Sequence, residues 1–328
     1  MALTRRNWLA GTLGAITLGP LHAQANAAAG VADETWIDSR RSRELPIKLR
    51  WPDASLHPGE RPIVLFSHGL GGTREGGAVW GAAWAQAGFV VLHLQHPGSD
   101  LTALRGTAGA FSNKAGLRSA ASPAQLVARL ADVGFALDEI GRRHTARQGL
   151  WATVRPSAIG MSGHSFGAHT TLGMAGQRYL RFDGVSEPRL AAFIAFSPSL
   201  PVAGDAQHAF ERVTRPLLSI TGTRDQDVAG TGATPDRRMA VFAALPKGSK
   251  RHLALQDADH MTFAGQTGRA VEIVPREAVT RDLQRDHHAL VAAITTDWWR
   301  ATLSGDAAAR ERLAAPAGLG VGDLWQAG

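Results

Sequence analysis

Runs of apolar residues divide this chain into predicted strands and helices. Residues 35–40 and 44–51 alternate apolar with polar positions on either side of a polar turn, which predicts an antiparallel hairpin. Later apolar runs are continuous, a pattern typical of strands that are buried on both faces of a parallel sheet. These continuous runs cover residues 63–67, 89–94, 192–197, 217–221 and 252–255, and a further one precedes Ser165.

Helical spacing separates the predicted strands. The clearest helix begins at Ser122, which is followed by Pro123 in the first turn and by Gln125, the residue that completes a capping box. Residues 102–121 show no period, and we expect them to form a long loop beside the functional site. Strands that alternate with helices predict an α/β fold, a doubly wound and mostly parallel sheet with helices on both faces. The other predicted helices cover residues 79–86, 236–244 and 280–303.

The composition narrows the class of protein. With 328 residues, of which 44% are hydrophobic and 19% charged, the chain is long enough to bury a large core in one domain. The net charge is +7, but only four of the 35 basic residues are lysines and the arginines are scattered, so no nucleic-acid partner is predicted. The absence of cysteine excludes disulfides, thiolate metal sites and a cysteine nucleophile.

The first 25 residues are typical of an export signal. Arg5 and Arg6 precede a modestly apolar stretch, residues 9–21, which is too short and too rich in glycine to span a membrane. An Ala-Gln-Ala sequence at residues 23–25 then offers a cleavage site. The pattern resembles bacterial twin-arginine signals, with a plain secretory signal as the alternative. We therefore expect an exported protein, periplasmic or secreted, with no stable membrane span and a single domain over residues 26–328.

A Gly-x-Ser-x-Gly motif predicts a nucleophile elbow. It runs from Gly163 to Gly167, with Ser165 on a tight turn between an apolar run and a helix-compatible run of small residues. Glycines flank the serine because the neighbouring strand and helix leave no room for Cβ atoms. Two glycines around a serine also occur by chance in a chain with 37 glycines, so the interpretation depends on the rest of the sequence.

A serine nucleophile needs a base, and the base needs a carboxylate that orients it. On a sheet of this kind the three residues follow in the order Ser, Asp, His, each after a strand. Asp225 and His260 directly follow two successive predicted strands, so Ser165, Asp225 and His260 are the predicted catalytic residues. Asp227 is the alternative to Asp225.

The other histidines near these motifs are weaker candidates for the catalytic base than His260. His287 and His288 lie in a helical pattern, where a solvated face is expected. His164 and His169 flank the nucleophile and are too close in sequence to fold back onto it. The aspartates beside His260 lack a second element at metal-ligand spacing, so neither a metal nor a cofactor is expected.

Acyl transfer also needs hydrogen-bond donors for the oxyanion that develops on the carbonyl oxygen. The predicted donors are the backbone N–H of Phe166, directly after the serine, and that of Leu70, in the glycine-rich loop after residues 63–67. A glycine-rich loop after a strand also cradles phosphate in some proteins, but neither phosphate-binding glycine fingerprint is present.

The substrate pocket is expected where the carboxyl ends of the strands meet, since ligands of open α/β sheets bind there. The glycine-rich loop, the segment after the next strand and residues 102–121 should converge near Ser165. Trp80 and Trp84 are candidates to flank the pocket, although two tryptophans four residues apart on a helix are also typical of a core. The predicted pocket residues are His68, Gly69, His96 and Trp80.

Several segments together resemble one branch of the α/β hydrolases. The similarity lies in FSHGLGGTREG, LQHPGSD, SPAQLVARLADV, GHSFGAHT, ITGTRDQDV and DADHMTF, between about Trp36 and Trp299. The branch contains bacterial predicted dienelactone hydrolases and platelet-activating-factor acetylhydrolase-like lipases. The resemblance implies an α/β-hydrolase fold and the roles given above to the triad and the oxyanion donors. True dienelactone hydrolases use a cysteine nucleophile, which this chain lacks, so the implied activity is ester hydrolysis.

We therefore expect an exported serine ester hydrolase that cleaves carboxylic esters without metal or cofactor. The resemblance implies small-molecule or lipid substrates with short-chain or phospholipid-derived acyl groups. A polyester is the alternative substrate, because related exported hydrolases cleave such polymers. Amide hydrolysis, peroxidation on the same triad and a non-catalytic binding role are the competing functions, and the complete predicted triad argues against the last.

Overall fold

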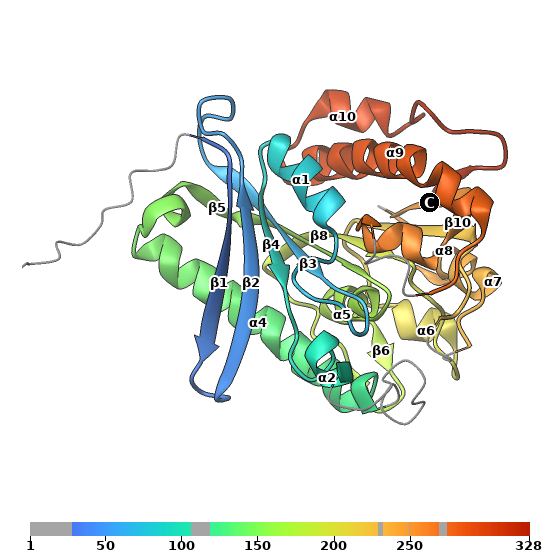
Figure 1. Ribbon diagram of the computed structural model, residues 1–328, viewed down its shortest axis with the longest axis horizontal. Helices are drawn as coiled ribbons and strands as arrows, with labels where there is room; N and C mark the ends of the chain where they lie inside the picture. Colours follow the sequence, from blue (N-terminus) through green and yellow to red (C-terminus); the bar gives the residue numbers. More distant parts are fainter. Residues whose placement is uncertain (1–27, 106–118, 229–231, 249, 269–273) are drawn as a thin grey trace, which may run out of the picture.

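A nine-stranded sheet runs through the computed structural model, which describes residues 28–105, 119–228, 232–248, 250–268 and 274–328 (Figure 1). The strands of this sheet are β1 (Gly30–Asp38), β2 (Arg43–Trp51), β3 (Arg61–Ser67), β4 (Val90–Leu94), β5 (Val154–His164), β8 (Leu190–Phe196), β9 (Leu217–Arg224), β10 (Lys250–Asp259) and β11 (Leu324–Ala327). Their order in space is β1-β2-β4-β3-β5-β8-β9-β10-β11. All pairs from β4 to β10 are parallel, and the pairs at both edges are antiparallel.

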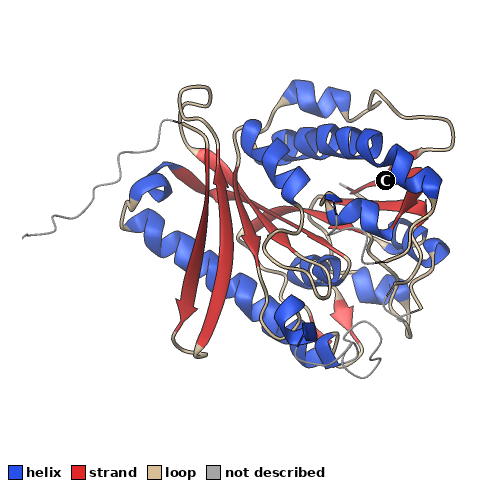
Figure 2. Cartoon of the chain, viewed as in Figure 1, coloured by secondary structure: helices blue, strands red, loops and turns tan. Residues whose placement is uncertain are grey.

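Helices cover both faces of the sheet, as Figure 2 shows. The long helices are α1 (Ala78–Gln86), α4 (Pro123–Thr145), α5 (Phe166–Ala175) and α9 (Ala278–Leu303). Shorter helical segments are α2 (Leu101–Arg105), η1 (Gly149–Thr153), α6 (Ala206–Phe210), α7 (Pro235–Met239), α8 (Val241–Ala244), η2 (His260–Ala264) and α10 (Ala307–Arg312). A separate two-stranded sheet consists of β6 (Arg178–Tyr179) and β7 (Phe182–Asp183).

Two hydrophobic clusters form the core, one on each face of the sheet. Neighbouring residues of β3 show the division, because Val64 packs into one cluster and Leu65 into the other. Helices α4 and α5 cover the Leu65 side, whereas α1, α9 and α10 cover the Val64 side. All five residues of β4 are buried, which explains why the central strands read as continuous apolar runs.

The predicted fold class is confirmed. The sheet is doubly wound and mostly parallel, and its first two strands form the expected antiparallel hairpin. The parallel order places the carboxyl ends of β3, β5, β9 and β10 along the same edge, where Ser165, Asp225 and His260 follow their strands. The predicted export signal, residues 1–25, lies outside the described residues.

Some local expectations need correction. The loop predicted at residues 102–121 begins as helix α2, and residues 106–118 lie outside the described part of the chain. The helix predicted at 236–244 is two short helices, α7 and α8. Ser122 does accept a hydrogen bond from the Gln125 backbone N–H at 3.4 Å, but the Gln125 side-chain oxygen has no hydrogen-bond partner among the described residues, so the capping box is half formed.

Candidate active site

Ser165 lies on a strained turn between β5 and α5. Its backbone has φ 56° and ψ −115°, a region that side-chain-bearing residues rarely adopt. The Ser165 N–H donates to the Phe196 carbonyl at 3.0 Å, which ties the turn to β8. A Cβ at Gly167 would collide with the Ser67 carbonyl oxygen, and one at Gly163 would collide with Gly167. Glycine is therefore required on both sides of the serine.

His260 and Asp225 form a buried pair. Strand β9 ends directly before Asp225, and β10 ends directly before His260, which begins η2. The His260 Nδ1 lies 2.7 Å from Asp225 Oδ1, and the second carboxylate oxygen accepts a hydrogen bond from Thr221 Oγ1 at 2.8 Å. A proton on Nδ1 that faces the carboxylate leaves His260 Nε2 free to act as a base. Asp227, the alternative acid, instead accepts a hydrogen bond from the Gly232 N–H.

Arg238 contacts both the carboxylate and the backbone carbonyl of Asp225. Its Nε lies 3.0 Å from Asp225 Oδ1 and donates to the Asp225 carbonyl at 2.9 Å. Burial alone would raise the pKa of Asp225. The hydrogen bond from His260 and the charges of His260 and Arg238 have a larger effect in the opposite direction, so the pKa of Asp225 lies below its usual value. The carboxylate therefore stays ionised beside the imidazole.

Other histidines, which the sequence did not assign to the site, support His260. The His164 Nε2 lies 2.9 Å from the His260 carbonyl oxygen, and the two rings lie 4.6 Å apart. His288 is buried and bonds through Nε2 to the Thr262 carbonyl in η2 at 2.9 Å, and His287 is buried too. The expectation of a solvated face for His287 and His288 is therefore wrong.

Ser165 and His260 both line two adjoining cavities. The larger measures about 330 Å³ and is also lined by Met261 and by the loop after β3, including His68, Gly69 and Leu70. The smaller measures about 50 Å³ and includes Leu70 and Phe166, the two predicted oxyanion donors. Within the described part of the chain, neither of their backbone N–H groups donates to another protein group, so both remain free for a ligand oxygen.

A buried arginine fastens the loop that carries Leu70. Arg129 of α4 is fully buried and donates to the His68 carbonyl at 2.6 Å and to Ser99 Oγ at 2.8 Å. Its guanidinium also lies over the Phe166 ring, 4.3 Å from the centroid. Burial lowers the pKa of Arg129 to about 9, which still leaves it charged at neutral pH.

The predicted pocket needs correction at two residues. His96 is fully buried behind the loop, where its ring bonds to Ser67 Oγ at 2.9 Å and to Asp132 at 3.0 Å. Trp80 is fully buried too and stacks on Phe196 in the core. Neither side chain lines the cavities beside Ser165, because both point into the protein interior.

Neither a metal-ligand cluster nor a membrane-spanning helix is found among the described residues. No cluster of three or more metal-ligating side chains occurs in residues 28–105, 119–228, 232–248, 250–268 or 274–328. Across the same ranges, no helix combines the length and the apolar character needed to cross a membrane.

One protein family matches part of the chain. Residues 42–108 match the model of platelet-activating factor acetylhydrolase, isoform II. The matched part runs from β2 through the loop with Leu70, and it ends before Ser165. It supports the resemblance to the platelet-activating-factor acetylhydrolase-like branch of the α/β hydrolases, and with it a hydrolase of the lipase or esterase type. No curated protein matches the sequence.

Proposed function

We propose, from the premise that the chain is related to the platelet-activating-factor acetylhydrolase-like α/β hydrolases, that it hydrolyses carboxylic esters with Ser165 as nucleophile. The observation that carries the proposal is the buried Asp225–His260 hydrogen bond of 2.7 Å beside a serine on a strained elbow. A side chain held in a rare backbone conformation is typical of a functional position.

The proposed reaction follows the chemistry of serine hydrolases. The Ser165 oxygen attacks the ester carbonyl carbon while His260 Nε2 accepts its proton, and the carbonyl electron pair moves onto the oxygen. The N–H groups of Leu70 and Phe166 stabilise that oxyanion. As the intermediate collapses, the alkoxide leaves with the proton from His260. Water then attacks the acyl enzyme by the same steps. His260 Nε2 accepts the proton of the water and passes it to Ser165 as the carboxylic acid is released.

Replacement of the nucleophile tests the proposal. Ser165→Ala should lower the turnover of p-nitrophenyl acetate on the order of 10⁴-fold or more, because only oxyanion stabilisation and substrate binding remain. A fluorophosphonate probe should label the wild type once per chain, at Ser165, as read by mass spectrometry. Ser199→Ala is the matched control, since Ser199 lines the same small cavity but does not lie on the elbow, and it should keep both activity and labelling. Full activity in Ser165→Ala would rule out the mechanism.

The preferred substrate is proposed as a small or lipid ester with a short acyl chain. A panel of p-nitrophenyl esters of increasing acyl length, with a peptide amide as control, measures this preference directly. A polyester is the second candidate, and release of soluble monomers from a polyester film would favour it.

Export is part of the proposal, because Arg5 and Arg6 precede an apolar stretch and a small-residue cleavage site. Fractionation of a bacterial host should find the protein outside the cytoplasm, and Arg5→Lys together with Arg6→Lys should retain it inside if a twin-arginine route is used.

A further inference from the structure

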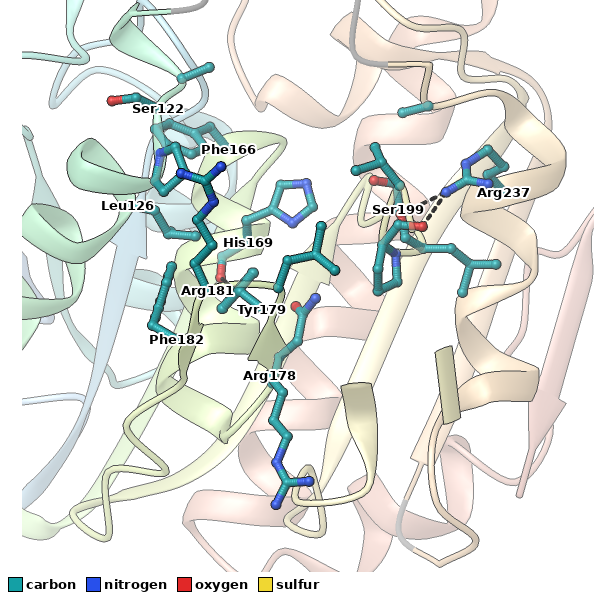
Figure 3. A pocket seen from close by; sticks show the side chains of 18 residues that line it. Ser122, Leu126, Phe166, His169, Arg178, Tyr179, Arg181, Phe182, Ser199 and Arg237 are labelled. Atoms are coloured by element: carbon teal, nitrogen blue, oxygen red, sulfur yellow. Dashed lines mark hydrogen bonds between the residues drawn. The ribbon is translucent and has the colours of Figure 1, made fainter. Parts of the chain in front are cut away.

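A third cavity, of about 300 Å³, adjoins the small cavity beside Ser165. We call it the Tyr179 cavity. Figure 3 shows its wall of aromatic and aliphatic side chains, which come from α4, α5, the β6–β7 hairpin and the segment after β8. Tyr179 and Phe182 stack with ring centroids 4.7 Å apart and form a flat apolar surface on one side. The main apolar lining residues are Leu126, Tyr179, Leu180, Phe182, Leu200 and Val202.

The Tyr179 cavity is continuous with the catalytic residues. Phe166 and His169 line both this cavity and the small cavity that holds Ser165 and His260. His169 lies at the junction, and burial lowers its pKa to about 4, so its ring is neutral at neutral pH. A group bound in the Tyr179 cavity can thus be part of an ester whose carbonyl lies at Ser165.

The position of His260 indicates which part of the ester enters the cavity. The general acid must lie within hydrogen-bond reach of the leaving oxygen. His260 lines the 330 Å³ cavity beside Met261 and the small cavity at Ser165, but it does not line the Tyr179 cavity. The alcohol therefore leaves on the Met261 side, and the acyl chain extends into the Tyr179 cavity.

Basic side chains also line the Tyr179 cavity. Three arginines line it, and no carboxylate does so among the described residues. Arg178 extends away from the cavity and pairs with Glu211 at 2.6 Å, and Arg237 donates to the carbonyls of Leu200 and Pro201 (Figure 3).

Arg181 differs from the other two arginines. Its side chain is exposed, forms no ion pair with any described residue, and extends toward Phe166 and Ser122 (Figure 3). The guanidinium group thus lies beside an apolar cavity, and no carboxylate among the described residues neutralises its charge.

We propose that the Tyr179 cavity is an acyl site for chains that end in a carboxylate, and that Arg181 pairs with that carboxylate. The proposal rests on the esterase function proposed above. A methylene group is about as large as a water molecule, roughly 30 Å³, so 300 Å³ holds an acyl group of up to about ten heavy atoms. Monoesters of dicarboxylic acids with about six carbons fit both the volume and the charge.

The test compares two esters that differ only at the far end of the acyl chain, monoethyl adipate and ethyl hexanoate, by ethanol release. The wild type should favour the adipate in kcat/KM by about fivefold, the size expected for a partly exposed ion pair. Arg181→Gln should abolish this preference by raising KM for the adipate, while ethyl hexanoate and ethyl acetate are hydrolysed as before. Arg181→Lys should keep part of the preference, and added salt should weaken it in the wild type.

Arg178→Gln is the matched control, because Arg178 lines the same cavity but is already paired with Glu211. It should leave the adipate preference unchanged. Equal use of both esters by the wild type, or the same effect from both arginine variants, would overturn the acyl-site proposal while the esterase function stands. Failure of the wild type to hydrolyse ethyl acetate or any other ester would instead overturn the esterase function itself.

Discussion

At the scale of single residues, the partner of His260 distinguishes two aspartates that are nearly equivalent in the sequence. Asp225 is buried and bonds to the imidazole, whereas Asp227 bonds to the backbone of its own loop. We expect Asp225→Asn to lower kcat on the order of 10⁴-fold, because an amide that donates to Nδ1 favours the wrong imidazole tautomer. Asp227→Asn should change kcat by less than about threefold, because substitutions outside the core and the triad change free energies by about 0.5 kcal/mol or less.

Steady-state kinetics with p-nitrophenyl acetate measure both aspartate variants, and circular dichroism checks that each is folded. The opposite ranking would move the acid to Asp227. Large and equal losses would mean that the loop, rather than one carboxylate, supports the histidine.

The sequence was informative about residues that follow directly on a strand. Ser165, Asp225 and His260 could be proposed because chain order and strand ends are local features. Arg238 and His164 could not. The contact of Arg238 with Asp225 depends on how the loop between β9 and α7 folds back, and His164 contacts His260 across 96 residues of sequence. His96 and Trp80 were predicted in the pocket for the same reason: a sequence does not tell which face of the sheet a side chain enters.

At the scale of elements, helix α4 holds the loop after β3 through one side chain. Arg129 makes a forked contact with the His68 carbonyl and Ser99, so a lysine cannot replace it fully. We expect Arg129→Lys to lower kcat on the order of 10²-fold with little change in KM, since loss of one oxyanion donor has about this effect. Esterase kinetics on p-nitrophenyl acetate give the two constants separately.

Arg143→Lys is the control on the same helix. Arg143 packs over Trp36 and pairs with Glu34 and Glu139, far from the loop, so its loss should lower stability without lowering kcat. If the two variants lose stability alike and neither loses kcat, Arg129 has a structural role only.

Long elements with a clear period were predicted well, and short ones were not. The capped start of α4 and the buried run of β4 agree with their patterns to within a residue or two. The β6–β7 hairpin has two residues in each strand, too few to show alternation. It nevertheless supplies Tyr179 and Phe182, so the shape of the Tyr179 cavity could not be predicted from the sequence.

At the scale of the whole molecule, buried histidines should make stability depend on pH. Burial lowers the pKa of His93 to about 3 and the pKa values of His96 and His252 to about 4. In the unfolded chain these rings take up protons below about pH 6.5. The unfolded state therefore binds more protons between about pH 6.5 and pH 4, and the free energy of unfolding must fall as the pH falls through this range.

Thermal unfolding between pH 7.5 and pH 4.5 measures this effect as a falling Tm. His93→Gln keeps a donor for the Gly76 carbonyl, to which His93 Nδ1 bonds at 2.8 Å, and removes one titrating group. The variant should show a shallower fall in Tm than the wild type. A Tm that stays constant down to pH 4.5 would contradict the role of the buried histidines.

The order of the strands makes it possible to measure the width of the sheet with two dyes. Strands β1 and β11 occupy opposite edges of the nine-stranded sheet, at most ~38 Å apart at the usual spacing between strands. The chain has no cysteine, so Thr35→Cys on β1 and Gln326→Cys on β11, both exposed, would be its only thiols. A donor and an acceptor dye on this pair span the full width of the sheet, and the energy transfer between them reports whether the sheet is intact while the active site stays unlabelled.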